Sequence, residues 1–219
     1  MKIATWNVAR PTKNSKRVPL ILDHLKSVDA DILILTETNE MLDLGNQYNS
    51  FHSTKPQEPF YKDGEKRVSI YSKYRSNGQI ETFRSDTSIC INFETPLGNI
   101  SVYGTIIGIN GNKRKNFITD LEEQLFDFER IAKTNNLCIS GDLNMTFFDN
   151  YYFTNDGRDR LNKAFDKLGL TNLTADIPQN IDHIIVPNKF FNAKESVDTW
   201  NNPVDKKLSD HIGVFAIIS

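Results

Sequence analysis

Short apolar segments bounded by polar turn residues dominate the chain, and eight of them have the length of β-strands. They are Ile3–Trp6, Ile32–Thr36, Val68–Tyr71, Ser88–Phe93, Ile100–Ile107, Leu137–Ser140, Ile184–Val186 and Ile212–Ile218. Ile32–Leu35 and Ile184–Val186 are apolar at every position, which is typical of strands buried on both faces. The turn residues Pro96–Asn99 predict a hairpin between the fourth and fifth segments.

Apolar residues at intervals of three and four predict three helices. These are expected over Val18–Leu25, Lys115–Ala132 and Arg160–Leu168. Strand hairpins and strand–helix alternation therefore occur together, which favours sheets covered by helices. Because no repeat and no Pro/Gly/Ser-rich linker divides the chain, we expect a single domain over residues 1–219.

Charge and cysteine content restrict the function. With 26 Lys+Arg against 28 Asp+Glu the net charge is −2, so no overall positive field attracts nucleic acid, although a local basic cleft is still compatible with this balance. Cys90 and Cys138 each lie inside an apolar segment, which predicts buried thiols, and two cysteines are too few for a disulfide framework or a cysteine zinc site.

The chain shows no targeting or membrane signal in its sequence. Met1 is followed almost at once by a strand-like segment, and no apolar run approaches the ~18–20 residues of a membrane span. We therefore expect a cytoplasmic protein, and we expect it to be a monomer.

Polar side chains gather at the ends of the predicted buried strands, where α/β proteins usually bind ligands. There are five such places: Asn7, Glu37, the Gly141–Asn144 stretch, Asp182–His183 and Ser209–His211. Each also has a purely structural interpretation. An Asn can close a turn, a Glu can face solvent or form a salt bridge, Asp142 and Asn144 can form an Asx turn, and a lone His is more often structural than catalytic.

Taken in order, these five places resemble the endonuclease/exonuclease/phosphatase family, whose members include abasic-site endonucleases and pancreatic-type deoxyribonuclease. The resemblance extends from Lys2 to Ile218, and the segment Met1–Asn7 looks like the opening of abasic-site nucleases. It implies an α/β fold in which two packed mixed β-sheets are flanked by helices in a four-layer sandwich. It also implies a divalent-metal-dependent phosphoesterase that uses Mg²⁺ or Mn²⁺.

The resemblance assigns roles to particular residues. Glu37, Asn7 and Asp210 match the positions that hold or support the metal. Asp142 matches the Asp that orients or deprotonates the attacking water, and Asn144 matches the Asn that holds a phosphate oxygen. Asp182 matches the residue that orients the catalytic His211, whereas its neighbour His183 matches no catalytic position. Whether Asp142 or His211 is the general base is left open by the sequence.

One position departs from the family. After the central strand many members carry a Tyr or His that faces the phosphate, but here Thr105 or Ile106 aligns there, and Tyr103 would fit only with a shift of two or three residues. The elements typical of inositol phosphatases, a Trp before the Gly-Asp-x-Asn motif and a Cys-Asp-Arg ending, are absent.

Three functions follow from this pattern. We favour hydrolysis of a phosphodiester in nucleic acid, DNA or RNA, over a phosphoesterase for a small or lipid-derived phosphate, and both over a silent binding domain. The basic runs Lys113–Lys115, Lys66–Arg67 and Lys206–Lys207 are interpreted as solvated faces, and the last is the nearest in sequence to His211. The aromatic stretch Phe147–Phe148 and Tyr151–Phe153 fits core packing better than base stacking. Trp200 either forms a wall of the site or belongs to the core.

Overall fold

The structure is a computed structural model, and it describes residues 1–190 and 196–219. Within them, twelve strands form two six-stranded sheets. The first sheet has the order β11 (Ser196–Trp200), β12 (Gly213–Ile217), β1 (Lys2–Asn7), β2 (Ile32–Asn39), β4 (Glu65–Ser72) and β3 (Asn49–His52). The second has the order β5 (Ser76–Ile80), β6 (Ser88–Thr95), β7 (Gly98–Ile106), β8 (Leu137–Asp142), β10 (Asp182–Pro187) and β9 (Leu170–Asn172).

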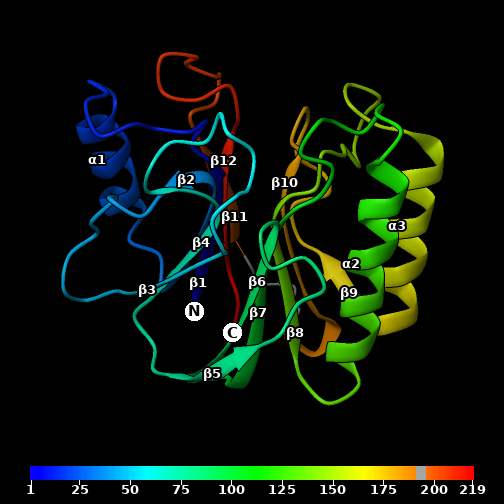
Figure 1. Cartoon of the computed structure of the whole chain (residues 1–219). Coiled ribbons are helices and arrows are strands. Elements are labelled where there is room, and N and C mark those ends of the chain that lie inside the picture. The colour runs from blue at the N-terminus through cyan, green and yellow to red at the C-terminus, as the bar shows by residue number, and fades with distance from the viewer. Residues whose placement is uncertain (191–195) are drawn as a thin grey trace.

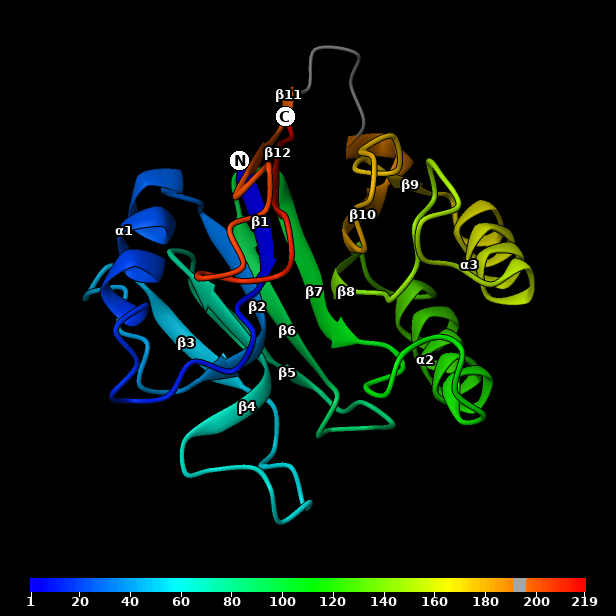
Figure 2. The same ribbon diagram turned by 90° about the horizontal axis from the view of Figure 1, so that it is seen from above.

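Helices cover the outer faces of both sheets. Figures 1 and 2 show α1 (Val18–Val28) outside the first sheet, and α2 (Phe117–Ala132) and α3 (Asn155–Leu168) together outside the second. Both sheets mix parallel and antiparallel pairs: β1 is parallel to β2 and antiparallel to β12, and β8 is parallel to β7 and antiparallel to β10. The predicted four-layer α/β sandwich is confirmed.

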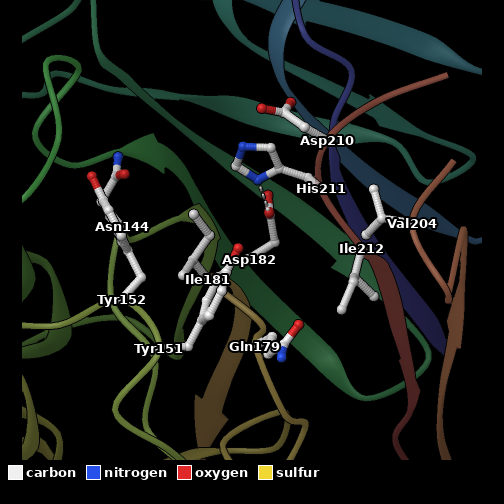
Figure 3. A pocket seen from close by; sticks show the side chains of 10 residues that line it. All are labelled: Asn144, Tyr151, Tyr152, Gln179, Ile181, Asp182, Val204, Asp210, His211 and Ile212. Atoms are coloured by element: carbon white, nitrogen blue, oxygen red, sulfur yellow. Dashed lines mark hydrogen bonds and ion pairs between the residues drawn. The ribbon is translucent and has the colours of Figure 1, made fainter. Parts of the chain in front are cut away.

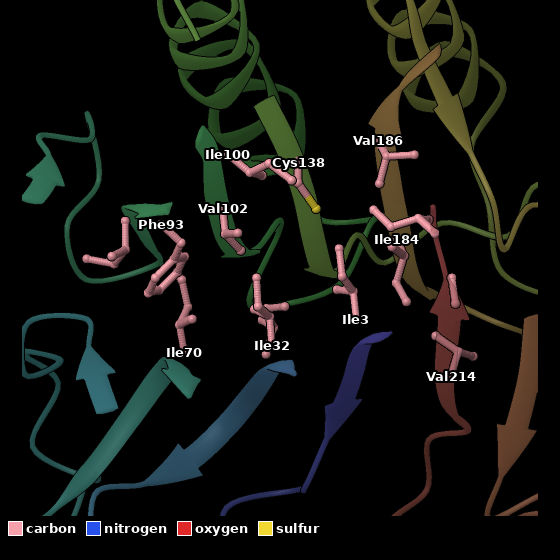
Figure 4. Close-up of a cluster of buried hydrophobic side chains, with 14 of the residues drawn as sticks. Ile3, Ile32, Ile70, Phe93, Ile100, Val102, Cys138, Ile184, Val186 and Val214 are labelled. Carbon is pink, nitrogen blue, oxygen red and sulfur yellow. The ribbon is translucent and has the colours of Figure 1, made fainter. Parts of the chain in front are cut away.

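The main core lies between the two sheets, as Figure 4 shows for side chains such as Ile32, Val102 and Val214. Two further clusters fill the spaces under the helices. The fully apolar segment Ile32–Leu35 supplies both sides of its sheet, since Ile32 and Ile34 join the intersheet core while Leu33 and Leu35 pack beneath α1. Its predicted burial on both faces is therefore confirmed.

The predicted helices and hairpin exist with shifted limits. The helix α3 begins at Asn155, five residues before the predicted Arg160, because Thr154 caps it by accepting a hydrogen bond from the amide of Gly157 (3.2 Å). The polar first turn that follows carries no apolar periodicity, which is why the pattern does not mark the start. The hairpin of β6 and β7 turns between Thr95 and Gly98, and both cysteines are buried and free as expected.

Four strands were not predicted: β3, β5, β9 and β11. All lie at the edges of the two sheets and are short and largely polar, so their own sequences carry little strand signal. The helices among the described residues are too short or too polar to cross a lipid bilayer.

The connectivity brings five strand ends to one edge of the sandwich. Parallel pairing places the end of β1 beside the end of β2. In the antiparallel pair of β8 and β10, Asp142 lies directly opposite Asp182, so the end of one strand meets the start of the other. The segment before β12 joins them because β12 runs antiparallel to β1. The polar residues expected at these strand ends therefore share one edge.

Candidate active site

Asp142 lies at the centre of this edge and is buried, with 2% of its surface exposed. One carboxylate oxygen accepts a hydrogen bond from the Asn7 side-chain amide (3.1 Å), and the other accepts one from the backbone amide of Asn144 (2.8 Å). Burial raises the pKa of Asp142 to about 7, and the positive charge of His211 opposes that rise. The carboxyl group can therefore both hold and release a proton near neutral pH.

Gly141 and Asn144 have backbone conformations that fix the turn around Asp142. A Cβ at Gly141, where φ is 137°, would lie 2.0 Å from the carbonyl oxygen of Thr105 on the adjacent strand, so only glycine fits there. Asn144 has a left-handed φ of 50°, and its side-chain amide donates to the carbonyls of Ile107 (3.0 Å) and Gly108 (3.2 Å). The structural interpretation of this stretch is therefore confirmed, since the Asp142 side chain and the Asn144 amide form an Asx turn, and Asn144 also lines a pocket.

His211 and Asp182 form a close ion pair (Figure 3), with Nδ1 of the imidazole 2.6 Å from Oδ2 of the carboxylate. Although burial favours the neutral ring, the charge and the hydrogen bond of Asp182 raise the pKa of His211 to about 10. The other carboxylate oxygen of Asp182 is buried without a hydrogen-bond partner among the described residues. The ring is thus held charged, with Nδ1 engaged and its opposite edge available.

The loop that carries His211 is fixed by three hydrogen bonds to its backbone. The indole of Trp6 donates to the His211 carbonyl (3.1 Å), and so does the side-chain amide of Asn201 (2.8 Å). The hydroxyl of Ser209 accepts from the His211 amide (3.1 Å) and donates to the carbonyl of Asn7 (2.6 Å). Trp200 packs edge-on against Trp6 and stacks with Phe215, so of its two possible places, a site wall and the core, it takes the core.

Two further carboxylates, Glu37 and Asp210, belong to the same edge. Glu37 has a left-handed φ of 45° inside β2, a strained conformation for a residue with a side chain. Its charge contributes to the raised pKa of Asp142, and the charge of Asp210 contributes to that of His211. Within residues 1–190 and 196–219, neither carboxylate takes part in a side-chain hydrogen bond or an ion pair. Burial lowers the pKa of Arg17, and the negative charges of Asp210 and Glu37 oppose this effect. The Arg17 guanidinium donates to the carbonyls of Leu208 (2.7 Å) and Ala9.

The oxygen donors at this edge fit a hard divalent cation. The donors are the carboxylates of Glu37 and Asp210 and the side-chain amide of Asn7. The described part of the chain contains no group of three His, Cys, Asp or Glu side chains arranged to enclose a metal. Mg²⁺ is usually held by one or two carboxylates and keeps several waters, whereas structural Zn²⁺ requires four protein ligands. The set therefore fits Mg²⁺ or Mn²⁺ and does not fit a closed zinc site.

A pocket of about 300 Å³ opens beside the His211–Asp182 pair (Figure 3). Its lining includes Asn144, Asp210 and two tyrosines, Tyr151 and Tyr152. The sequence favoured core packing for the aromatic stretch, and this is right only for Phe147 and Phe153, which pack against the core beneath α2 and α3. Tyr151 is 65% exposed, so core packing is wrong for the middle of the stretch, where two tyrosines line the pocket instead.

Residues 4–211 match the Endonuclease/Exonuclease/phosphatase family, a span that includes Asn7, Glu37, Asp142, Asn144, Asp182, Asp210 and His211. The chain belongs to this family. No curated protein matches the sequence at a significant level.

Solved structures agree with the family fold over the whole chain. An AP endonuclease from Archaeoglobus fulgidus superimposes with a TM-score of 0.71 at 20% identity, covering 100% of this chain and 99% of that one. A 3′ phosphatase, NExo from Neisseria, bound to a product DNA hairpin, gives 0.73 at 17% identity and the same coverage. A humanized TDP2 from D. rerio gives 0.68 at 12% identity, covering 100% and 98%. At these identities the likeness concerns the fold.

Tyr103, Thr105 and Ile106, the positions after the central strand where this chain departs from the family pattern, are all buried. Tyr103 is fully buried and donates its hydroxyl to Asp127 of α2 (3.0 Å), away from the site. Thr105 is buried too and hydrogen-bonds Gln124 of the same helix, and Ile106 belongs to the intersheet core. None of the three side chains lines the pocket beside His211.

His183, the neighbour of Asp182, points to the opposite face of its strand. Its ring is fully buried between Thr174 (3.0 Å to the hydroxyl) and the carbonyl of Met145 (2.8 Å), and burial lowers its pKa to about 4. It therefore has a structural place, as expected for a histidine that matches no catalytic position of the family.

We expect His183→Ala to lower stability while most activity is retained, because the change removes a fully buried ring and its hydrogen bond to the carbonyl of Met145. The expected loss near pH 8 is about 2–3 kcal/mol of unfolding free energy. The folded pKa of about 4 lies below the ordinary 6.5, so this neutral histidine contributes fully above about pH 6.5 and progressively less as the pH falls toward 4. Urea unfolding at about pH 8 and about pH 5 measures the difference between variant and wild type. A difference that widens at the lower pH contradicts the assignment.

Proposed function

We propose that this protein is a divalent-metal-dependent phosphodiesterase that hydrolyses nucleic acid. The observation that carries the proposal is the buried carboxyl group of Asp142, hydrogen-bonded to Asn7 and lying opposite the Asp182–His211 ion pair at the edge that also carries Glu37 and Asp210. Membership of the Endonuclease/Exonuclease/phosphatase family supports the same reaction class.

The protonation states favour Asp142 as the general base and His211 as the cationic partner. A base must accept a proton near the working pH, and the pKa of Asp142 at about 7 suits this task. The pKa of His211 at about 10 keeps its ring protonated at neutral pH, so the ring can stabilise negative charge on a phosphoryl oxygen or donate a proton to the leaving oxygen. Asn144 lines the same pocket and is proposed to hold a phosphate oxygen. Because both hydrogens of its side-chain amide donate to the carbonyls of Ile107 and Gly108, it must exchange one of these bonds for the phosphate.

Glu37, Asp210 and Asn7 are proposed to hold the metal, since they supply the oxygen donors that fit Mg²⁺ or Mn²⁺. A bound divalent ion supplies neutralisation of the phosphate charge. The chain itself contributes orientation: Asn7 donates to Asp142 while its side-chain oxygen accepts from the amide of Ala9 (2.9 Å), so both ends of this side chain are held in place beside the base.

Nucleic acid is favoured over other phosphoesters because of the pocket and the structural relatives. Tyr151 and Tyr152 offer aromatic surface next to His211, which suits a sugar or base adjoining the scissile phosphate. Two of the similar structures are an AP endonuclease and a 3′ phosphatase bound to DNA. A phosphoesterase for a small or lipid-derived phosphate is the second candidate. The cytoplasmic location and the monomeric state stay predictions from the sequence.

We expect hydrolysis to require Mg²⁺ or Mn²⁺ and to be abolished by excess EDTA. Glu37→Gln removes one charge without changing side-chain size, so it should raise the Mg²⁺ concentration required for half-maximal activity at least about tenfold. The melting temperature without metal should stay nearly unchanged, because the Glu37 carboxylate has no hydrogen bond to lose within residues 1–190 and 196–219. The assay compares an abasic-site duplex, single-stranded DNA, RNA and a phosphomonoester.

Glu40→Gln is the matched control, since Glu40 is a half-exposed carboxylate paired with Lys66 outside the site. It should leave the Mg²⁺ requirement as it is in the wild type. Full activity in excess EDTA excludes the proposed metal dependence. Much faster turnover of the phosphomonoester than of every nucleic acid makes the second candidate the function.

A further inference from the structure

A second hollow, of about 330 Å³, opens on the Glu37 side of the site and has no role in the reaction described so far. Its lining consists of Arg10, Glu37, Glu58, Phe60, Tyr61, Ile109 and Asn110. Because Glu37 lines it, whatever occupies the hollow adjoins the place where the scissile phosphate would bind. The pocket beside His211 shares none of these residues.

An exposed aromatic ring forms one wall of this hollow. Phe60 is 61% exposed, and its ring centroid lies 4.9 Å from that of Tyr61. Arg10 fixes both: its guanidinium lies 4.3 Å from the centre of the Tyr61 ring and donates to the carbonyl of Phe60 (3.1 Å) and to the buried carboxylate of Glu65 (2.8 Å). A solvent-facing aromatic ring beside the candidate site suggests a stacking surface.

The charged groups of this hollow are largely paired already. Arg10 is neutralised by Glu65, and Glu58 pairs with Arg67, which also pairs with Asp86. Among the described residues, the lining of this hollow therefore contains no unpaired cation for a phosphate group. It offers an aromatic face and the side-chain amide of Asn110, which together suit a flat, neutral ring with hydrogen-bonding edges, the chemistry of a nucleobase.

Positively charged side chains line a neighbouring hollow that shares Asn110. A third hollow, of about 430 Å³, is lined by Asn110, Arg114, Lys115 and Asn116. Neither Arg114 nor Lys115 forms an ion pair in the part of the chain that the structure describes, and both are exposed. The loop that carries them contacts the candidate site through one hydrogen bond, which the side-chain amide of Asn112 donates to the carbonyl of Asn144 (2.7 Å). Asn110 lines both hollows, so the exposed basic residues Arg114 and Lys115 lie next to the hollow that contains Phe60.

We propose that these two hollows form a nucleotide-binding subsite for the strand that flanks the scissile phosphate. The base stacks on Phe60 and meets the amide of Asn110, and the next phosphate is held by Arg114 and Lys115. This assignment rests on the proposed function, and it specifies that the enzyme recognises an unpaired, single-stranded nucleotide on the Glu37 side.

The test compares two oligomers of equal length and charge, oligothymidine and an oligomer of abasic tetrahydrofuran nucleotides, which lacks bases. Phe60→Ala should lower kcat/KM for oligothymidine roughly tenfold, the effect of losing one stacked base, and should leave that for the abasic oligomer nearly unchanged. Phe60→Trp should restore the ratio. Phe83→Ala is the matched control, since Phe83 is 59% exposed on a different surface beside Phe126.

Binding without turnover provides the independent measurement. Fluorescence anisotropy of labelled oligothymidine in EDTA should show weaker binding for Phe60→Ala than for Phe83→Ala. Arg114→Ala should make the slope of log K against log salt shallower by about 0.7, with Lys133→Ala unchanged. Equal discrimination between the two oligomers by Phe60→Ala and wild type overturns the subsite. If the wild type cleaves neither oligomer, the anisotropy comparison alone decides the subsite. The proposed function fails only if none of the nucleic acids, duplex abasic-site DNA and RNA included, is hydrolysed with Mg²⁺ or Mn²⁺.

Discussion

His211→Ala is expected to lower kcat/KM by about 10²–10⁴-fold, because it removes the cationic ring that faces the pocket beside Asp142. Asp182→Asn should cause a loss of similar order. The carboxylate of Asp182 lies 2.6 Å from Nδ1 and holds the ring charged, whereas an amide cannot stabilise that charge. Steady-state kinetics of both single variants on the preferred nucleic acid measure the two losses.

The double variant distinguishes a pair from two separate contributors. Since Asp182 acts through His211, the double loss should scarcely exceed the larger single loss. His52→Ala is the control, because His52 is a half-buried histidine bonded to Ser69 (2.7 Å) outside the site, and it should keep wild-type activity. Losses that multiply in the double variant contradict a single functional unit.

The central strands could be predicted from the sequence because buried strands consist of continuous apolar residues. Ile32–Leu35 is apolar at each position and supplies two separate cores, so its pattern alone identifies a strand covered on both sides. The edge strands β3, β5, β9 and β11 could not be recognised in the same way. A segment such as Ser76–Ile80 is polar and contains a glycine, and only its pairing with β6 makes it a strand.

Site residues that directly follow buried strands could be predicted from the sequence. Contacts between residues of different loops could not. Asn7, Glu37 and Asp142 follow apolar segments, so their position in the sequence already indicates a shared sheet edge. The pairing of Asp182 with His211 joins residues 29 apart in the chain and came from the family resemblance. The stretch Phe147–Phe153 shows the limit, because alternate packing inward and outward in a loop follows no regular period.

The hollow beside Glu37 illustrates the same limit more strongly. Arg10, Phe60 and Asn110 come from three separate loops, and none of them follows a recognisable strand pattern. Two consecutive left-handed residues, Ala9 (φ 50°) and Arg10 (φ 55°), turn the chain after β1 so that the Arg10 guanidinium reaches Phe60 and Tyr61. Backbone conformations of this kind in residues other than glycine are not encoded by a local motif.

Asp142→Asn is expected to lower kcat by about 10²–10⁴-fold with little change in folding stability. The amide has the size of the carboxyl group, and its oxygen can still accept from the amide of Asn144 or from Asn7, but it cannot accept a proton from water. Two effects on stability oppose each other: the variant loses one of two buried hydrogen bonds, and it removes a buried negative charge that lies opposite Asp182. We therefore expect the unfolding free energy near pH 8 to change by no more than about 1 kcal/mol.

Single-turnover kinetics and urea unfolding of the same preparation separate the two quantities. Binding of oligothymidine in EDTA should be as tight as in the wild type or tighter, since a negative charge near the phosphate has been removed. Asp127→Asn is a matched control, because Asp127 is an equally buried carboxylate, bonded to Tyr103 and to the amide of Phe83 (2.7 Å) away from the site, and its loss should lower stability while turnover persists. If Asp142→Asn keeps more than about a tenth of the wild-type kcat, Asp142 is not the base, and that role passes to another group at the same edge.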